Sequence, residues 1–323
     1  MKIAIIGAGL SSATLCQSLK ALGTLTIFEK SRGVGGRMAT RQGIDAAWDH
    51  GAPCFIARDG GFKQFLQPFL ADQTLTEWHP KMTTLGLNQK PYKRAWFEPH
   101  YVGQPTMNQW IKPLFAGHAV ETQCEIESIY GAPGQWFLAS VDRAHGPFDW
   151  VLSSAPIGQT QTLFADFNFS LTARYQPGFT LLCQMPFSPS WDRAVCQDAV
   201  VAEMIRSGRR PGRRPANTLV VHAQDQWASE QIASAPAIVE QTLRCAAEAL
   251  LNTEFDSAKL HRWRSAKVIE AAATTHWLNP ARQLGACGDW GGTQGVESAF
   301  LSGKALGEAL GEVLAKALIT LPK

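Results

Sequence analysis

The N-terminal part of the chain alternates apolar runs with a segment of small residues. Residues 2–6 form an apolar run, residues 10–22 carry small residues with a helical pattern, and residues 24–30 form a second apolar run. This order predicts a βαβ unit of about thirty residues, which is how a Rossmann-type domain opens.

The following pattern predicts one helix and several strands. Residues 107–115 are expected to form a helix and residues 119–130 a strand. Residues 135–142 and 148–156 flank a short turn, so we expect them to pair as a hairpin whose second strand ends at Pro156.

The later part of the chain mixes strand-like runs with one amphipathic helical pattern at residues 238–251. The strand-like runs cover residues 180–185, 218–224 and 260–268. This mixture predicts a second, mixed α/β domain. The chain then returns to an apolar run and a second glycine-rich turn, GDWGG, near its C-terminus.

The turn between the first predicted strand and helix contains Gly7, Gly9 and Ser12. Glycines there permit a tight turn and let a diphosphate approach the N-terminus of the helix, whose free N–H groups favour negative charge. The alternative is an ordinary tight turn, because the third position holds Ser instead of Gly or Ala. Glu29 favours the dinucleotide interpretation, since it ends the second strand, where a carboxylate can bind ribose hydroxyls.

The segment EKSRGVGGRMATR follows directly, and its glycines loosen the backbone around Arg32 and Arg37. Guanidinium groups beside such a loop suit a diphosphate, and a flexible solvated loop is the alternative. We therefore predict an α/β fold. A discontinuous Rossmann-type FAD/NAD(P)-binding domain is expected from residues 1–57, 100–158 and 276–323, and a mixed-sheet α+β substrate domain from residues 58–99 and 159–275.

Composition narrows the class of ligand. A chain of 323 residues exceeds the size at which one core usually stops growing, and a net charge of +3 gives no strong field, so neither nucleic acid nor a membrane surface is expected as a partner. The seven cysteines are scattered without metal-ligand spacing, so we expect no disulfide framework, no metal and a reducing, cytoplasmic location. A small-molecule substrate is the remaining class.

Several segments together resemble the flavin-dependent amine oxidase superfamily, and within it the renalase-like FAD oxidoreductases. These segments are KSRGVGGRMATR, WDHGAPCFIARD, YVGQPTM, HRWRSAKV and ACGDWGGTQGVESAFLSGKALGEAL. The resemblance implies that both glycine turns hold one FAD, with Asp289 on its ribityl and diphosphate portion. Cys54 departs from the family, because a polar or aromatic residue is expected there.

By this resemblance, backbone at Ile126 meets the adenine, the segment 50–52 passes along the flavin ring, and backbone around Val296 and Glu297 lies near a flavin carbonyl. The residues predicted to bind the cofactor are Gly7, Gly9, Ser12, Glu29, Lys30, Arg32, Gly36, Arg37, His50, Gly51, Ala52, Ile126, Asp289, Val296 and Glu297.

The segment LHRWRSAKV supplies the predicted catalytic residues, because the resemblance places it beside the flavin. Strand alternation puts His261, Trp263 and Lys267 on one face. The alternative is a core Trp flanked by surface charges. The predicted substrate contacts are Arg58, Tyr101, Arg209 and Arg210; the last two lie in an arginine-rich segment, 206–215, for which a solvated loop is the favoured alternative.

The resemblance implies oxidation of isomeric dihydro-NAD(P), in its 2- or 6-dihydro form, by hydride transfer to FAD with O₂ as acceptor and H₂O₂ as product. Loss of hydride makes such a substrate aromatic, so no protein base is required. One alternative is a flavin-dependent amine oxidase that uses Lys267. The other is a flavin-binding or interaction protein without catalysis.

Overall fold

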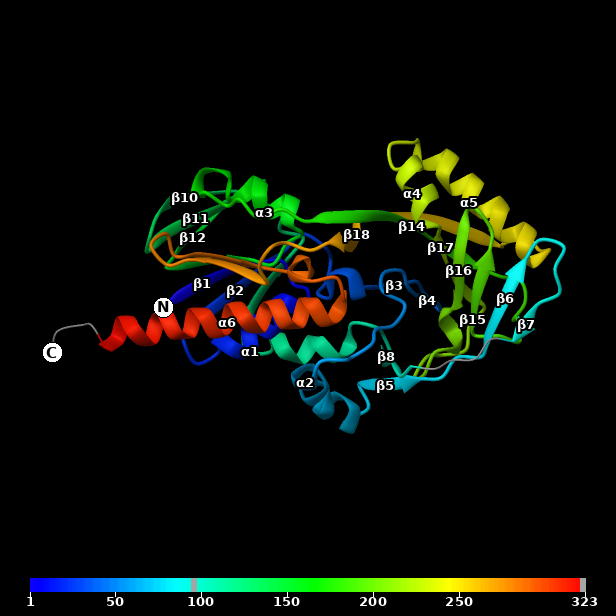
Figure 1. Ribbon diagram of the computed structural model, residues 1–323, viewed down its shortest axis with the longest axis horizontal. Coiled ribbons are helices and arrows are strands. Elements are labelled where there is room, and N and C mark those ends of the chain that lie inside the picture. Colours follow the sequence, from blue (N-terminus) through cyan, green and yellow to red (C-terminus); the bar gives the residue numbers. More distant parts are fainter. Residues whose placement is uncertain (94–97, 320–323) are drawn as a thin grey trace. The chain divides into compact units, whose positions relative to one another are not determined.

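The structure is a computed structural model that describes residues 1–93 and 98–319 (Figure 1). The chain divides into two compact units, and each combines separate stretches of sequence. The first unit comprises Met1–Gly36, Ile111–Arg174 and Val268–Lys323, and the second comprises Arg37–Trp110 and Tyr175–Lys267. These units differ from the predicted domains. Residues 37–57 and 100–110, predicted for the cofactor domain, lie in the second unit, and residues 159–174 and 268–275, predicted for the substrate domain, lie in the first. Residues 94–97 and 320–323 of the expected domains lie outside the described residues.

The first unit is built on a Rossmann-type sheet. Within the described residues this sheet has six strands, and all neighbouring strands are parallel except the antiparallel edge pair β19–β20. The apolar residues of its central strands are buried, as expected for parallel strands covered on both faces. The strand order is β19 (His276–Asn279), β20 (Leu284–Cys287), β13 (Trp150–Ser153), β1 (Lys2–Ile6), β2 (Thr24–Glu29) and β9 (Ala119–Thr122).

The helices of this unit are α1 (Leu10–Leu19), α3 (Ile157–Leu163) and α6 (Val296–Ile319). Helix α6 runs beside α1, although the two come from opposite ends of the sequence (Figure 1). A Cβ on Gly303 of α6 would lie 2.5 Å from the carbonyl oxygen of Ser11, so glycine at this position lets the two backbones approach closely. The predicted first βαβ unit is confirmed, with α1 ending at Leu19.

A smaller antiparallel sheet corrects two predictions. Its strands are β10 (Ile126–Ala132), β11 (Gln135–Ser140) and β12 (Ala144–Phe148). The predicted partner of β11 was wrong: β11 pairs with β12, while β13 leaves to lie parallel to β1. The single strand predicted at 119–130 is interrupted, because Gln123 takes the left-handed conformation (φ 56°) and separates β9 from β10. The helix predicted at 107–115 is a 3₁₀ helix over Gln109–Phe115 that contains Pro113.

The second unit contains the mixed sheet that the sequence predicted. Its core joins the sheet to the helices α4 (Asp225–Gln231) and α5 (Pro236–Leu251) through fully buried side chains such as Val221, Leu243 and Phe255. Counting described residues only, the sheet has seven strands, in the order β18 (Ser257–Glu270), β14 (Arg174–Gln184), β17 (Thr218–Ala223), β16 (Val201–Arg206), β15 (Arg193–Gln197), β6 (Met82–Gly86) and β7 (Tyr92–Lys93).

Two short strand pairs and one helix complete this unit. The pairs are β3 (Thr40–Gln42) with β4 (Ala47–Asp49), and β5 (Leu75–Trp78) with β8 (His100–Gly103). Helix α2 (Gly60–Ala71) is capped by Asp59, whose side chain accepts a hydrogen bond from the backbone N–H of Phe62 at 2.7 Å. No helix in the described part of the chain combines the length and the apolarity needed to cross a membrane.

Candidate functional site

The turn between β1 and α1 uses its two glycines for different reasons. Gly7 has a φ of +97°, and a Cβ there would lie 2.7 Å from Ser154 Oγ, so the turn itself requires glycine. Gly9 caps α1 with an extended backbone that any residue can adopt, and a Cβ there would meet no atom within 4 Å. Ser12 Oγ lies 2.7 Å from Ser154 Oγ and fastens the start of α1 to the end of β13. Gly9 thus leaves open space in front of the helix N-terminus, where a diphosphate can be bound.

Glu29 lies at the end of β2, beside this turn, and is 6% exposed. One carboxylate oxygen accepts a hydrogen bond from the backbone N–H of Ala8 at 2.8 Å, and the other accepts one from Ser31 at 2.8 Å. These bonds fix the orientation of the carboxylate. Each oxygen has a further lone pair, so the group can also accept hydrogen bonds from ribose hydroxyls.

The N-terminal turns of α1 and α6 are joined directly. Ser11 Oγ donates a hydrogen bond to the carbonyl oxygen of Ala299 at 2.9 Å, across a separation of 288 residues. Val296 begins α6, and Glu297 is buried in its first turn. The free backbone N–H groups of both helix N-termini therefore lie close together in the same unit.

The C-terminal glycine turn follows β20. Asp289 begins a 3₁₀ turn over Asp289–Gly291 and is 5% exposed. The backbone N–H of Gly288 donates to Ser302 Oγ of α6 at 2.9 Å, which ties the turn to that helix. Cys287 is fully buried, and burial raises the pKa of its thiol well above the usual range, so it is an inert core residue.

The remaining predicted cofactor residues of the first unit are Lys30, Arg32, Gly36 and Ile126. The loop before Gly36 contacts the turn between β1 and α1, because the backbone N–H of Gly35 donates to the carbonyl oxygen of Ala8 at 2.8 Å. Lys30 forms an exposed ion pair with Glu125 at 3.5 Å. Arg32 is exposed, and Ile126 is buried at the start of β10.

In the second unit, the predicted segment His50, Gly51 and Ala52 packs against Arg37. The backbone N–H of Ala52 donates to the carbonyl oxygen of Arg37 at 2.8 Å, and a Cβ on Gly51 would lie 1.8 Å from that same oxygen. The Arg37 guanidinium donates to the carbonyl oxygen of Ser265 at 3.3 Å. Arg37 thereby holds this segment next to β18.

His50, His261 and Trp263 form one aromatic cluster. The His50 ring stacks on Trp263 with centroids 5.3 Å apart, and the His261 ring lies 4.2 Å from Trp263 and 4.7 Å from His50. The Trp263 indole N–H donates to the carbonyl oxygen of His50 at 3.0 Å. His50 Nδ1 is buried and makes no hydrogen bond with any described residue. The structure thus brings His261 and Trp263, which were predicted to be catalytic, into contact with His50, which was predicted to bind the cofactor.

Both imidazoles of this cluster are neutral at pH 7. Burial, together with the neighbouring His50 and Arg41, lowers the pKa of His261 to about 4. Burial, and then the charge of Arg41, also lowers the pKa of His50 below its usual value. The cluster therefore offers flat, uncharged rings and no cationic acid.

Lys267, the third predicted catalytic residue, forms an exposed ion pair with Asp225 at the start of α4, and both side chains are more than half exposed. Exposed pairs of this kind contribute only about 0–1 kcal/mol, so the lysine can leave this partner at little cost. A catalytic role for Lys267 stays a prediction.

The arginine-rich segment is not the solvated loop that its composition favoured. Arg210 Nη1 lies 2.7 Å from Asp49 Oδ2, and Arg213 Nη2 lies 2.6 Å from the same oxygen. All three side chains are at most 4% exposed. Arg206 is also buried and donates to the carbonyl oxygen of Trp191 at 3.2 Å. Asp49 makes this burial possible, because its carboxylate offsets part of the positive charge.

The predicted substrate contacts are therefore engaged within the second unit. Arg210 belongs to the buried cluster with Asp49, whereas Arg209 pairs with Asp192 at 3.4 Å and is half exposed. Arg58 pairs with Glu98 at 3.3 Å on the surface. Burial raises the pKa of Tyr101, so its phenol is protonated at neutral pH. Substrate binding by these four residues stays a prediction.

Asp49 was not singled out from the sequence. It follows Trp48 in the segment WDHGAP and looks like any polar residue at the end of a short strand. Its carboxylate also accepts hydrogen bonds from Thr40 Oγ1 and, at 3.3 Å, from the backbone N–H of Met107. Two of its partners are distant along the chain: Met107 is more than fifty residues away and Arg210 is 161 residues away. No local sequence pattern therefore identifies Asp49.

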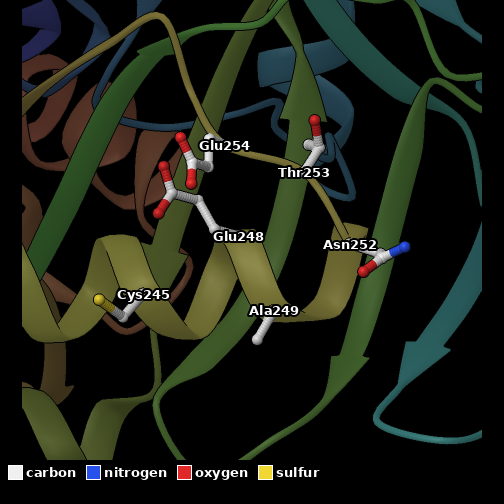
Figure 2. Close-up of a pocket in the computed structure, with 6 residues that line it drawn as sticks. All are labelled: Cys245, Glu248, Ala249, Asn252, Thr253 and Glu254. Carbon is white, nitrogen blue, oxygen red and sulfur yellow. The ribbon is translucent and has the colours of Figure 1, made fainter.

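A surface hollow lies at the C-terminal end of α5, lined by Cys245, Glu248, Ala249, Asn252, Thr253 and Glu254 (Figure 2). Glu248 is already used there: it accepts hydrogen bonds from Arg244 at 2.8 Å and from the backbone N–H of Phe255 at 2.7 Å. The hollow is thus a feature of the helix end and contains none of the predicted site residues.

Comparison with known proteins agrees with this architecture. Residues 5–69 match the family described as NAD(P)-binding Rossmann-like domain. The first unit carries a Rossmann-like domain.

Solved structures show the same fold over nearly the whole chain. A candidate protoporphyrinogen oxidase from Exiguobacterium sp. 255-15 aligns with a TM-score of 0.72 at 10% identity, over 96% of this chain and 98% of that one. An oxidoreductase from Methanosarcina mazei aligns with a TM-score of 0.72 at 14% identity, over 95% and 100%. Putrescine oxidase with bound putrescine aligns with a TM-score of 0.68 at 11% identity, over 97% and 99%.

Replacing Asp289 by alanine should weaken binding of the predicted FAD without unfolding the protein. A charge-assisted hydrogen bond contributes about 1.5–3 kcal/mol, so its loss should weaken cofactor affinity by about one to two decades. Equilibrium dialysis of FAD measures the affinity, and circular dichroism monitors the fold. The control is Asp166→Ala, which removes an exposed carboxylate from the same unit. Equal affinity in the two variants would contradict the role of Asp289.

Replacing His261 by glutamine should reduce the loss of stability on mild acidification. Its pKa is about 4 in the folded protein and about 6.5 when unfolded, so between these pH values the unfolded chain binds more protons and stability falls as the pH falls. Thermal unfolding from pH 7 to pH 4 should show a smaller decline in His261→Gln than in the native protein. The exposed His79→Gln serves as control, and an unchanged pH profile in His261→Gln would argue against a neutral His261.

Proposed function

We propose that this protein is an FAD-dependent oxidoreductase. The observation that carries the proposal is the hydrogen bond between Ser11 and Ala299, which joins the N-termini of α1 and α6. Two adjacent helix N-termini suit a long anionic ligand better than a mononucleotide, because each can stabilise a separate negative group. The Rossmann-like match and the fold shared with putrescine oxidase support the same class.

The residues of the first unit fit such a cofactor. The space in front of Gly9 would admit the diphosphate, and the oriented carboxylate of Glu29 would accept hydrogen bonds from the adenosine ribose. Asp289 would accept hydrogen bonds from the ribityl chain, and the backbone at Val296 would face the flavin. FAD, when bound, accepts a hydride from the substrate and passes the electrons to O₂, which gives H₂O₂.

The proposed substrate is an isomeric dihydronicotinamide, the 2- or 6-dihydro form of NAD or NADP. Such a ring becomes aromatic when it loses hydride, so no group of the protein has to remove a proton. The aromatic cluster of His50, His261 and Trp263 is neutral, and its flat rings are suited to align a nicotinamide ring by stacking. The contribution of the protein to the reaction is then to align the nicotinamide ring for hydride transfer.

A second candidate is amine oxidation. It is favoured by the similarity to putrescine oxidase, whose structure holds putrescine. In that case Lys267 would hold a catalytic water molecule after releasing Asp225. The third possibility, a flavin-binding protein without turnover, predicts that no substrate reduces the bound cofactor.

Anaerobic mixing distinguishes these functions. The purified protein should be yellow, and 2- and 6-dihydro-NAD(P) should bleach its absorbance much faster than the 4-dihydro form or putrescine. Rapid bleaching by putrescine alone would select amine oxidation. Yellow protein that no compound bleaches would select the non-catalytic alternative, and a colourless protein that cannot be reconstituted with FAD would refute the flavin site.

A further inference from the structure

A carboxylate, a thiol and an imidazole gather at one edge of the first unit. Glu121 lies on β9, Cys124 follows that strand, and His145 lies on β12 of the smaller sheet. One ligand atom from each residue lies within 4.8 Å of the other two. Oxygen, sulfur and nitrogen donors thus share a volume close to that of a metal coordination sphere.

The distance between the thiol and the imidazole equals the spacing of two zinc ligands. Cys124 Sγ lies 3.5 Å from His145 Nε2. With zinc–sulfur and zinc–nitrogen bonds of about 2.3 and 2.1 Å and a tetrahedral angle, two such ligands are about 3.5 Å apart. Glu121 Oε2 lies 3.6 Å from Nδ1, the other nitrogen of the ring, so its side chain has to rotate toward Nε2 to share the ion. Since the three ligand atoms lie within 4.8 Å of one another, no pair has to close by more than roughly 1.5 Å.

The imidazole is held in place, whereas its neighbours can adjust. The His145 side chain is 6% exposed, and its ring meets Phe28 edge-on at 4.8 Å. Ser140 Oγ lies 3.2 Å from Nε2 and adds a polar contact on the thiol side. Cys124 and Glu121 are only partly buried. The fixed imidazole lowers the ordering cost of forming the site, and the other two side chains have room to move onto the ion.

The competing interaction is weak. Arg143 Nη2 lies 2.5 Å from Glu121 Oε2, but the arginine side chain is 64% exposed. An exposed ion pair of this kind contributes about 0–1 kcal/mol, so a divalent cation can replace the guanidinium.

We propose that Glu121, Cys124 and His145 bind one zinc ion, with water in the remaining position. Sulfur, nitrogen and oxygen are the donors that zinc takes in proteins, and three protein ligands with one open position form a common arrangement. The backbone N–H of Cys124 donates to the carbonyl oxygen of Glu29 at 3.0 Å, so the ion would stiffen the connection after β9 next to that residue. This site stands independently of the proposed oxidoreductase function.

The test uses the whole purified protein, with any bound flavin, after treatment with a chelator and gel filtration. Zinc chloride is then titrated against a chromophoric competitor, and bound zinc is counted after a second gel filtration. One ion per chain is expected, together with a raised melting temperature that increases with zinc concentration. Cobalt chloride should add the visible absorption bands of a tetrahedral thiolate complex.

Variants locate the ion. Cys124→Ser and Glu121→Gln should each weaken binding at least about tenfold, since even the loss of a supporting group costs that much at a metal site. Arg143→Ala should bind zinc more tightly, because it frees Glu121. The control Cys245→Ser removes the exposed thiol shown in Figure 2 and should bind like the native protein. The proposal is overturned if the native protein binds no zinc at micromolar concentration, or if Cys124→Ser binds it as well as Cys245→Ser does.

Discussion

Replacing Gly9 by valine should weaken FAD binding by about one to two decades while the protein still folds. A Cβ at this position meets no atom of the described chain within 4 Å, and the backbone is extended, so neither the backbone nor a Cβ opposes the substitution. It would instead fill the space in front of α1 that we assign to the diphosphate. Overpacking of this kind costs about 1–3 kcal/mol, or about one to two decades in affinity.

The comparison with Gly7 makes this test specific. Gly7→Ala should destabilise the fold, because Gly7 has a φ of +97° and its Cβ would lie 2.7 Å from Ser154 Oγ. Gly9→Val should lower the free energy of unfolding by no more than about 1 kcal/mol, the difference between N-cap residues. Gly311→Ala, in an open position on α6, is the control, and it should raise the free energy of unfolding by about 0.5–1 kcal/mol. Chemical denaturation and flavin content of the three variants are the measurements, and full flavin content in Gly9→Val would place the diphosphate elsewhere.

Replacing Asp49 by asparagine should destabilise the protein by about 3–5 kcal/mol, because it leaves Arg210 and Arg213 buried without a counter-charge. Urea denaturation measures the loss. The control is Glu98→Gln, which breaks the exposed pair with Arg58 and should cost less than about 1 kcal/mol. A second variant, Asp49→Asn with Arg213→Met, should recover part of the loss. A change in Asp49→Asn as small as that of the control would show that the cluster does not stabilise the fold.

The same carboxylate predicts a pH dependence. Burial alone would raise the pKa of Asp49, but the guanidinium groups of Arg210 and Arg213 and two hydrogen bonds outweigh it and hold the pKa below its usual value. The stabilisation is therefore complete above the unfolded pKa, which is about 3.9, and is lost as the pH falls through the lower folded value. Acid unfolding below pH 4 should be less steep in Asp49→Asn than in the native protein.

The sequence by itself determined the local elements. Apolar patterns identified β1, α1, β2, α5 and the long strands of the second unit, because each pattern reflects which side chains of a single element are buried. Glycine positions identified both turns, since the need for a tight or open backbone is a local property. The resemblance to flavin oxidoreductases rested on these same local segments.

Tertiary structure alone decided which distant residues meet. The hairpin partner of β11 was mistaken because β12 contains His145, Gly146 and Pro147 and has the composition of a turn, whereas β13 is an apolar run that joins the larger sheet by pairing with β1. The clusters around Asp49 and around Cys124 were invisible for a related reason. Each cluster forms only when separate elements pack together. Asp49 and Arg210 are 161 residues apart in the sequence, and Cys124 and His145 are 21 residues apart. Hydrophobic periodicity contains no information about such contacts, because it reports which face of an element is buried and not what that face touches.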